Sequence, residues 1–270
     1  MAPAVEFQDV SFEFDDHVIL DNLSFTIPQG DMRVLLGPSG TGKSILLKLI
    51  LGLFRPDSGR ILVNGRRIDD LGERELLQVR ANVGMLFQES ALFDSLTVYE
   101  NVGYRLYEET QMSADDADGR VREVLGFVGL AEYGDRMPSE LSGGQRRRVA
   151  IARAMASRPK LLLFDDPTVG LDPVIATTVD HEIVKLRDLE QVTSIVVTHQ
   201  IRDAHYIAKH EAVKNGDRVE IRDADEEKAA RVVFMVLSEG RIQFEGSVEA
   251  LLSSKDPFLE RFLFMTLPPW

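Results

Sequence analysis

The stretch Gly37-Pro38-Ser39-Gly40-Thr41-Gly42-Lys43-Ser44 decides the fold, because it fully matches the pattern GxxxxGK(S/T). Glycines in such a loop let backbone N–H groups and the start of the next helix point at phosphate oxygens. Lys43 would place a positive charge beside the β and γ phosphates, and the Ser44 hydroxyl can ligate Mg²⁺. A chance match in a chain of this length has a probability on the order of one in a hundred. The motif therefore predicts a nucleotide site that runs from Gly37 through Ser44 to Ile45.

The flanking segments give this loop the context that it requires. Arg33–Leu36 is a short apolar run typical of a strand, and apolar residues recur at helical spacing from Ile45 to Leu53. Further along, helices and apolar strands alternate: helix 144–157, strand 161–164, helix 174–189 and strand 194–198. This alternation predicts an α/β fold with a mainly parallel, doubly wound sheet, and continuous apolar runs are typical of strands buried on both faces. The expected fold class is that of a P-loop NTPase.

Three segments depart from the alternation. Residues 5–27 alternate apolar and polar side chains in two runs around Asp15-Asp16, which predicts an N-terminal antiparallel β region. Residues 89–139 lose the buried-strand runs and predict an inserted helical subdomain, with a helix start or loop at 112–120. Residues 209–231 are highly charged and predict a surface insertion. We therefore expect a nucleotide-binding core formed by 1–88 and 140–270, and a helical subdomain formed by 89–139 that ends at a second glycine-rich motif.

The composition excludes several classes of protein. The formal net charge is −13, and an acidic chain is a poor candidate for binding nucleic acid, which needs clustered Lys and Arg. The absence of cysteine excludes disulfides, thiolate metal sites and a cysteine nucleophile. The longest apolar stretch, 45–54, contains Lys48 and is far shorter than the roughly 20 residues of a membrane-spanning helix. We expect a soluble cytoplasmic protein without a signal peptide, which reaches a membrane only through a partner.

A pair of carboxylates follows the strand at 161–164. The sequence there reads Leu161-Leu162-Leu163-Phe164-Asp165-Asp166, and the end of a parallel strand lies at the edge of the sheet where ligands bind. Asp165 would hold Mg²⁺ through water, and Asp166 would face the attacking water. Taken alone, two acids after a strand are more often a solvated strand end, but the phosphate-binding loop elsewhere in the chain favours the functional interpretation.

A second glycine-rich motif, Leu141-Ser142-Gly143-Gly144-Gln145, precedes a helix that carries arginines at 146–148. A glycine-rich helix N-terminus is another anion-binding end. The chain thus has two such ends but only one GK(S/T) lysine. For the pentapeptide alone, a simple helix cap with surface arginines is a reasonable interpretation.

With these three motifs in this order, the chain resembles the nucleotide-binding subunit of ABC transporters over nearly its whole length. In that family two subunits pack head to tail, and the signature segment of one closes over the ATP held by the other. The resemblance implies binding of ATP and Mg²⁺, an ATP-dependent homodimer and an integral membrane permease as partner. It also implies ATP-driven closure of the dimer, followed by hydrolysis that reopens it.

The resemblance assigns roles to matching positions. Gln88, in Leu86-Phe87-Gln88, would contact Mg²⁺ and link to the permease. His199 would contact the γ-phosphate, although a lone histidine after a strand is normally a loop residue. Asp172 would lie at the dimer interface, and Phe14 would stack on adenine, with a core phenylalanine as the alternative. The residues that would contact the partner's γ-phosphate are Ser142, Gly143, Gly144 and Gln145. The residues expected to act in catalysis are Lys43, Gln88, Asp166 and His199, and those expected to ligate the metal are Ser44, Gln88 and Asp165.

Residues 87–98 and 137–140 are similar to those of bacterial Mce/Mla-type lipid transporters. That resemblance implies a lipid-binding Mce-type partner, phospholipid or other hydrophobic cargo, and a peripheral position on the inner face of the bacterial cytoplasmic membrane. Two features depart from the family pattern. The charged segment 209–231 exceeds the usual short connection, and Asp166 stands where the family has glutamate. Because aspartate is one methylene shorter, we expect slow hydrolysis together with tight ATP binding.

Three other functions are compatible with parts of this pattern. The chain could be the ATPase of an importer for polar amino acids or other small solutes. It could be a soluble ABC protein that acts on ribosomes or DNA, which the single domain and the acidity disfavour. It could also be a regulatory protein that binds ATP with little turnover. A phosphate-release assay distinguishes such a protein from an active ATPase. The cargo and the direction of transport do not follow from the sequence.

Overall fold

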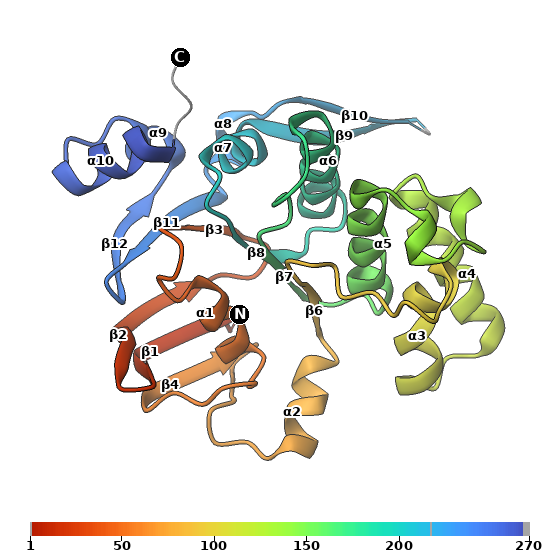
Figure 1. Ribbon diagram of the computed structural model, residues 1–270, viewed down its shortest axis with the longest axis horizontal. Coiled ribbons are helices and arrows are strands. Elements are labelled where there is room, and N and C mark those ends of the chain that lie inside the picture. Colours follow the sequence, from red (N-terminus) through yellow and green to blue (C-terminus); the bar gives the residue numbers. More distant parts are fainter. Residues whose placement is uncertain (1, 217, 267–270) are drawn as a thin grey trace.

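The computed structural model describes residues 2–216 and 218–266, and its centre is a six-stranded sheet (Figure 1). The strands lie in the order β12-β11-β3-β8-β7-β6, and all neighbours are parallel except β12, which runs antiparallel to β11. Their bounds are β3 Met32–Leu36, β6 Val83–Leu86, β7 Leu161–Asp165, β8 Thr193–Val197, β11 Val232–Ser238 and β12 Arg241–Gly246. The strands predicted at 33–36, 161–164 and 194–198 and the mainly parallel sheet are confirmed.

A second sheet is formed mostly by the N-terminal part of the chain. Strands β1 (Val5–Phe14), β2 (His17–Ile27), β4 (Ser58–Val63) and β5 (Arg66–Arg67) pair antiparallel in the order β2-β1-β4-β5. Asp15 and Asp16 both have positive φ, 48° and 62°. Two such residues form the tight turn whose twist matches a hairpin, and aspartate tolerates this conformation. The predicted antiparallel β region is confirmed.

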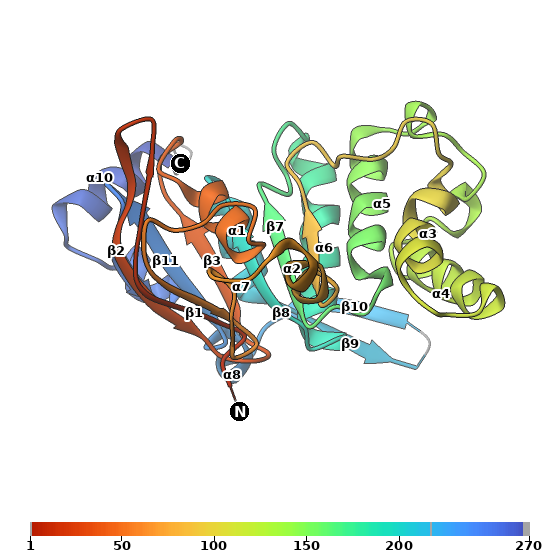
Figure 2. The same cartoon turned by 90° about the horizontal axis from the view of Figure 1, so that it is seen from below.

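The central sheet is buried on both faces. Leu161 and Leu163 of β7 face an apolar cluster shared with β1, β2, β4 and α1 (Lys43–Ile50), while Leu162 and Phe164 face a second cluster shared with the helices. Strand side chains alternate between the two faces of a sheet, and here both faces are covered. Every residue of β7 is therefore buried. Figure 2 shows the resulting layers, with the antiparallel sheet on one side, the parallel sheet in the middle and helices on the other side.

Most helices cover one face of the parallel sheet and extend beyond it, whereas α1 lies on the opposite face with the antiparallel sheet. Helix α5 (Gly143–Ala156) contacts α3 (Val98–Glu109), α4 (Ala114–Phe127) and α6 (Pro173–Leu189), so it joins the helical part to the sheet. The remaining helices are α2 Glu73–Arg80, α7 Ile201–Lys209, α8 Glu226–Ala229, α9 Val248–Leu252 and α10 Pro257–Thr266, with 3₁₀ turns at Ala131–Tyr133 and Pro138–Glu140. The predicted helices at 144–157 and 174–189 are confirmed within one residue, whereas the exact division into two subdomains stays a prediction.

The charged segment 209–231 has a structure of its own. It forms a hairpin of β9 (His210–Asn215) and β10 (Arg218–Asp223), followed by α8, and β9 packs against α6 (Figure 1). Glu211 is 2% exposed and is held by Arg222 and Lys228 at 2.6 and 2.7 Å. The segment lies on the surface as predicted, but the buried carboxylate of Glu211 connects its strands and α8 through the more exposed Arg222 and Lys228.

Candidate functional site

The phosphate-binding loop links β3 to α1 in a conformation that only glycine fits. Gly37 and Gly42 have φ angles of 154° and 91°, and an added Cβ would lie 2.3 Å from the Leu237 carbonyl oxygen at the first and 2.5 Å from the Ile19 side chain at the second. Within the described residues, no side chain caps the N-terminus of α1. Backbone N–H groups at this helix start are therefore available to an anion.

Lys43 is almost fully buried beneath this loop, with 6% of its surface exposed. Its ammonium donates to the carbonyl oxygens of Gly37 and Pro38 at 2.9 and 2.7 Å. Burial lowers the pKa of Lys43, and the charges of Asp166 and Asp165 partly oppose that shift. A buried ammonium that is held mainly by neutral carbonyls gains strongly from an anion such as a phosphate.

Ser44 and Asp165 come together from different elements. The Ser44 hydroxyl on α1 donates to Asp165 Oδ1 at the end of β7 at 2.7 Å. Burial raises the pKa of Asp165, the hydrogen bond from Ser44 lowers it, and the neighbouring Asp166 raises it further. A hydroxyl beside a carboxylate supplies the hard oxygen ligands that Mg²⁺ takes when phosphate and water complete its octahedron. The donor set therefore fits Mg²⁺.

Asp166 and His199 form a pair at the same edge of the sheet. Asp166 has a φ of 44°, and its N–H donates to the carbonyl oxygen of Val197 at 2.8 Å. Its Oδ1 accepts from the N–H of His199 at 3.3 Å and lies 2.8 Å from Nδ1 of the imidazole. An ionised carboxylate only accepts, so Nδ1 carries the proton and Nε2 is left for another partner. The short carboxylate is thus directed at the histidine.

Phe14 lies at the end of β1, beside the hairpin turn. It is 51% exposed, so it is not a core phenylalanine. Its ring meets Phe54 edge to face, with centroids 6.4 Å apart. One face of an aromatic ring that is supported in this way is accessible to a planar group such as a nucleobase.

The signature segment begins α5 and is satisfied by its own side chains. Ser142 Oγ accepts from the Gln145 N–H at 3.2 Å, and Gln145 Oε1 accepts from the Ser142 N–H at 2.9 Å. This is a capping box. Gly144 packs on α6, where an added Cβ would lie 2.2 Å from Ile175 Cγ2. Asp172 caps α6 itself, because its Oδ1 accepts from the N–H groups of Val174 and Ile175, each at 3.1 Å.

The structure brings some predicted site residues together and keeps others apart. Lys43, Ser44, Asp165, Asp166 and His199 meet at the carboxyl edge of the parallel sheet. Gln88 and Gly143 instead line a shallow hollow with Arg146, Arg147 and residues 169–171. Helices α1 and α5 lie apart in both ribbon views (Figures 1 and 2). The signature of one chain does not reach the phosphate loop of the same chain.

Sequence reasoning missed two arginines of the signature helix that touch the segment around Gln88. Arg147 is 5% exposed, and Arg153 is partly buried. Burial lowers the pKa of Arg147, while the charge of Asp166 raises it, so the guanidinium lies close enough to that carboxylate to interact with it. The arginine run at 146–148 was visible in the sequence, but nothing in it distinguishes the buried Arg147 from its exposed neighbour Arg146.

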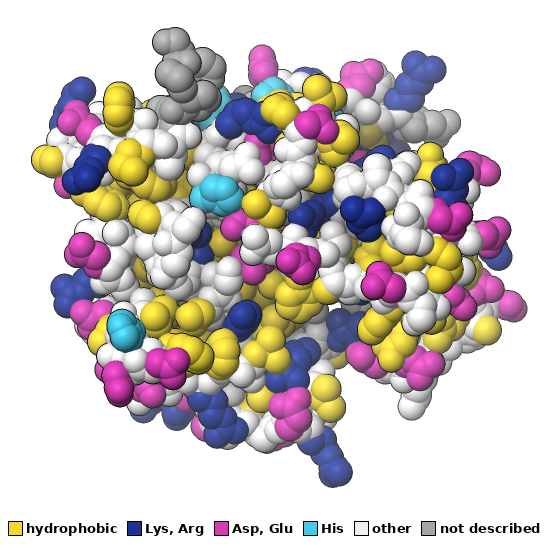
Figure 3. Space-filling view, viewed as in Figure 1, with side chains coloured by type: hydrophobic (Ala, Val, Ile, Leu, Met, Phe, Trp, Pro, Cys, Tyr) yellow, Lys and Arg dark blue, Asp and Glu magenta, His cyan; other side chains and the backbone are white. Residues whose placement is uncertain are grey.

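Four large apolar side chains in the chain before and after Gln88 are exposed. Leu77 on α2, Phe87, Phe93, and Tyr104 on α3 are 36–58% exposed. Figure 3 shows hydrophobic side chains gathered along the hollow between the α2 region and the helices α3 and α4. Apolar patches of this kind mark a surface that contacts another protein or a membrane. No helix in residues 2–216 and 218–266 has the length and apolar character to cross a bilayer.

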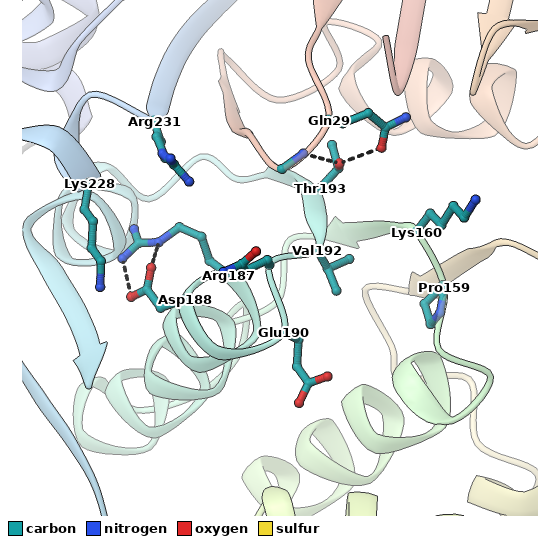
Figure 4. A pocket seen from close by; sticks show the side chains of 12 residues that line it. Gln29, Pro159, Lys160, Arg187, Asp188, Glu190, Val192, Thr193, Lys228 and Arg231 are labelled. Carbon is teal, nitrogen blue, oxygen red and sulfur yellow. Dashed lines mark hydrogen bonds and ion pairs between the residues drawn. The ribbon is translucent and has the colours of Figure 1, made fainter. Parts of the chain in front are cut away.

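A separate cavity lies at the opposite edge of the sheet (Figure 4). Its lining includes Thr193, which begins β8, and Lys160, which precedes β7. Ligands of open parallel sheets bind at the carboxyl ends of the strands, whereas these residues lie at the amino ends. Arg187 in its wall is paired with Asp188 at 2.8 Å. The cavity is therefore not part of the nucleotide site.

Comparison with known proteins gives consistent results. The ABC transporter family profile matches residues 20–169. The chain is 38% identical over 263 residues to the intermembrane phospholipid transport system ATP-binding protein MlaF of Escherichia coli, covering 97% of this chain and 89% of that protein. It is 33% identical to a probable ribonucleotide transport ATP-binding protein of Mycobacterium tuberculosis, covering 97% of this chain and 67% of that protein. A dimeric, post-hydrolysis ATP-binding cassette bound to ADP and Pi matches with a TM-score of 0.73 and 28% identity, covering 90% of this chain and 98% of that one.

Proposed function

The chain belongs to the ABC transporter family as an ATP-hydrolysing, ATP-binding subunit, and we propose that it works as a homodimer that drives a membrane permease for phospholipid. The observation that carries the proposal is the meeting of Lys43, the Ser44–Asp165 pair and the Asp166–His199 pair at one edge of the sheet. That edge combines a cation, a metal-ligand set and a candidate base beside the helix N-terminus that would bind phosphate.

We propose the following roles in hydrolysis. Lys43 would bind the β and γ phosphates, Ser44 and Asp165 would hold Mg²⁺, and Gln88 would supply a further oxygen ligand in the closed site. Mg²⁺ would neutralise charge on the phosphate oxygens. Asp166 accepts a proton from the attacking water and also holds the Nδ1–H of His199, so that Nε2 faces the γ-phosphate. Phe14 stacks on the adenine, and residues 37–42 and Ile45 form the surrounding loop and helix start.

A homodimer follows from the separation of the two glycine-rich helix starts. Because the signature does not reach the phosphate loop of its own chain, we propose that it binds the γ-phosphate held by a second copy. Ser142, Gly143, Gly144 and Gln145 would provide this contact, and Asp172 would lie beside it. The dimeric cassette with 28% identity supports this arrangement.

The proposed permease docks on the exposed apolar surface of Leu77, Phe87, Phe93 and Tyr104. The segment 87–98 suits the same position, because it contains Gln88 and would therefore move when the site closes. Attachment through this surface would place the chain peripherally on the inner face of the cytoplasmic membrane. Phospholipid cargo and a lipid-binding Mce-type partner rest on the likeness to MlaF.

Co-expression with the permease tests this proposal. The complex is purified in detergent and its bound small molecules are identified by mass spectrometry, with a complex carrying Lys43→Ala as the matched control for ATP-driven release. We expect phospholipid to copurify and to be lost on addition of ATP and Mg²⁺ only when Lys43 is present. A polar solute in place of lipid would instead favour a small-solute transporter, the function suggested by the mycobacterial relative.

A further inference from the structure

Arg147 reaches from the signature helix to the segment that carries Gln88. Its Nη1 donates to the carbonyl oxygen of Phe87 at 2.9 Å and to that of Gln88. Its Nη2 lies 3.4 Å from the carbonyl oxygen of Val169, in the loop that follows Asp166. A single buried guanidinium therefore joins α5 to two loops that flank the nucleotide site.

Arg153 makes a second connection, six residues further along α5. Its Nη1 and Nη2 donate to the carbonyl oxygens of Ala91 and Ser90 at 2.7 and 2.8 Å. Ser90 and Ala91 both have left-handed backbone conformations, with φ of 65° and 47°. Such conformations are unfavourable in non-glycine residues and persist only where contacts enforce them. The fork of Arg153 provides such contacts.

The two arginines together hold the carbonyl groups of Phe87, Gln88, Ser90 and Ala91. Arginine suits this task because its rigid planar fork donates in several directions and remains charged when buried. These contacts go to backbone rather than to side chains, so they fix the path of the chain whatever the residue types. The N-terminus of the same helix is the signature segment.

We propose that Arg147 and Arg153 are positioning residues that lock residues 87–91 to the signature helix, so that binding of the helix N-terminus by the partner's nucleotide moves Gln88. The proposal rests on the proposed dimer and adds the physical connection within each chain. Displacement of α5 must carry the locked carbonyls with it, because packed elements move as rigid bodies. The signature contact and the permease surface near Phe87 would then change together.

Hydrogen exchange of residues 87–91 tests the proposal in the full chain. The change is Arg147→Lys, which keeps the charge but removes the fork, in a background where hydrolysis is blocked by Asp166→Asn. In the parent we expect ATP and Mg²⁺ to slow exchange of these amides at least about tenfold on dimer formation. With Arg147→Lys the dimer should still form, but the slowing at 87–91 should fall to less than about twofold. Arg153→Lys should act in the same way and gives a second, independent variant.

Arg148→Lys is the matched control. Arg148 lies on the same helix and donates to the carbonyl oxygen of Val128 at 2.9 Å, away from residues 87–91. This control should keep the parent's slowing, which separates loss of the lock from general loosening of α5. Full slowing at 87–91 in Arg147→Lys and Arg153→Lys would overturn the proposal. Absence of an ATP-dependent dimer in the parent would instead refute the proposed function on which it rests.

Discussion

The two glycine-rich helix starts are built in opposite ways. At α1 the cap position is Gly42, a left-handed glycine, and Lys43 lies buried beneath the loop. At α5 the cap is Ser142, whose hydroxyl and N–H are both bonded to Gln145. The first start offers its backbone N–H groups and a cation to an incoming anion. At the second start, the hydrogen bonds between Ser142 and Gln145 already satisfy part of the polar groups.

This difference explains why one chain does not form a complete site. The α1 start has the cation, the Ser44–Asp165 pair and the Asp166–His199 pair around it. The α5 start is held against α6 by Gly144, and Lys43 belongs to the other start. The arginines beside the α5 start, Arg146 and Arg147, donate to the carbonyl oxygens of Leu141 and of Phe87 and Gln88. A helix end whose neighbouring cations are engaged in this way binds an anion weakly by itself. It can, however, add to a phosphate that is already held, which is what a second chain would present.

The largest expected effect comes from the cation of the first start. Lys43→Ala removes charge-assisted contacts to two phosphates, and at about 1.5–3 kcal/mol each this corresponds to roughly 10²–10⁴-fold weaker ATP binding. Arg146→Ala, beside the signature, should leave ATP binding by the isolated chain unchanged within about twofold. Calorimetric titration with ATP and Mg²⁺ measures both. Equal losses in the two variants would mean that the two helix starts share one site within a chain.

The second prediction concerns the α5 start and its partner. Ser142→Arg should raise the dissociation constant of the ATP-dependent dimer more than about 100-fold, because it places a long side chain where the partner's γ-phosphate would lie. Ser142→Ala removes the cap at a cost of about 1 kcal/mol but adds no bulk, so the dimer should persist. Light scattering with hydrolysis blocked decides between these outcomes. A parent protein whose mass ignores ATP would refute the composite site.

The sequence predicted the first start better than the second. The loop 37–44 is a dense local pattern, and the strand and helix beside it follow from apolar runs in the same stretch. Arg147 at the second start is different, because its role depends on hydrogen bonds to carbonyl oxygens about sixty residues away in sequence. The burial of Glu211 in a charged segment likewise depends on contacts outside the local pattern, with Arg222 and Lys228 of the same segment. The local periodicity of a sequence does not predict such contacts.

Several short strands and helices were also hard to predict from the sequence. The short strands β4 and β5 and the helices α2 and α10 were not anticipated, because brief segments give little periodicity to read. Phe14 was expected at the nucleotide, and its exposure agrees with that position, although its contact with adenine stays a prediction. The pairing of Asp166 with His199 needed coordinates, since 33 positions separate the two residues.

The third prediction tests the carboxylate of the first start. Asp166 is one methylene shorter than glutamate, and misplacement of about 1 Å can cost about 10²-fold in rate. Its Oδ1 is also engaged by His199. Asp166→Glu should therefore accelerate steady-state ATP turnover by about 10–10²-fold with ATP affinity unchanged. Asp172→Glu, a matched extension at the cap of α6, should not accelerate turnover. If Asp166→Glu is no faster than the parent, the length of the side chain does not limit hydrolysis.

The smallest expected effect concerns α6, the helix on which the second start rests. Asp180 on α6 is 1% exposed, and within the described residues its Oδ1 has no hydrogen-bond partner. Burial and the charge of Asp203 together raise the pKa of Asp180 to about 9, although Arg202 acts in the opposite direction. Burial raises the pKa of the neighbouring Tyr206 phenol, and the Asp180 carboxyl raises it further when it is ionised. Asp180 is therefore a neutral acid in the folded chain at pH 7.

The sign of the pH dependence follows from this raised pKa. Between the unfolded value near 4 and the folded value of about 9, the folded chain binds one proton more than the unfolded chain. The free energy of unfolding should therefore fall as pH rises through that window, by at most ~1.4 kcal/mol per unit. Asp180→Asn keeps a neutral group of similar shape and removes the dependence. The three units from pH 5 to pH 8 correspond to at most about 4 kcal/mol. At about 2–4 °C per kcal/mol, the gain in Tm of Asp180→Asn over the parent should therefore be up to roughly 8–16 °C larger at pH 8 than at pH 5.

Thermal unfolding at pH 5, 6.5 and 8 measures this effect, with Asp188→Asn as the contrast. Asp188 is also buried but holds Arg187 through both oxygens, so neutralising it should lower Tm at every pH. ATP binding at the α1 start should be unaffected by Asp180→Asn, because that residue lies on the helix behind the signature. A drop in Tm at pH 8 would show that Asp180 is an ionised, stabilising carboxylate. In that case an ionised Asp180, and not a neutral buried acid, would stabilise the packing of α6.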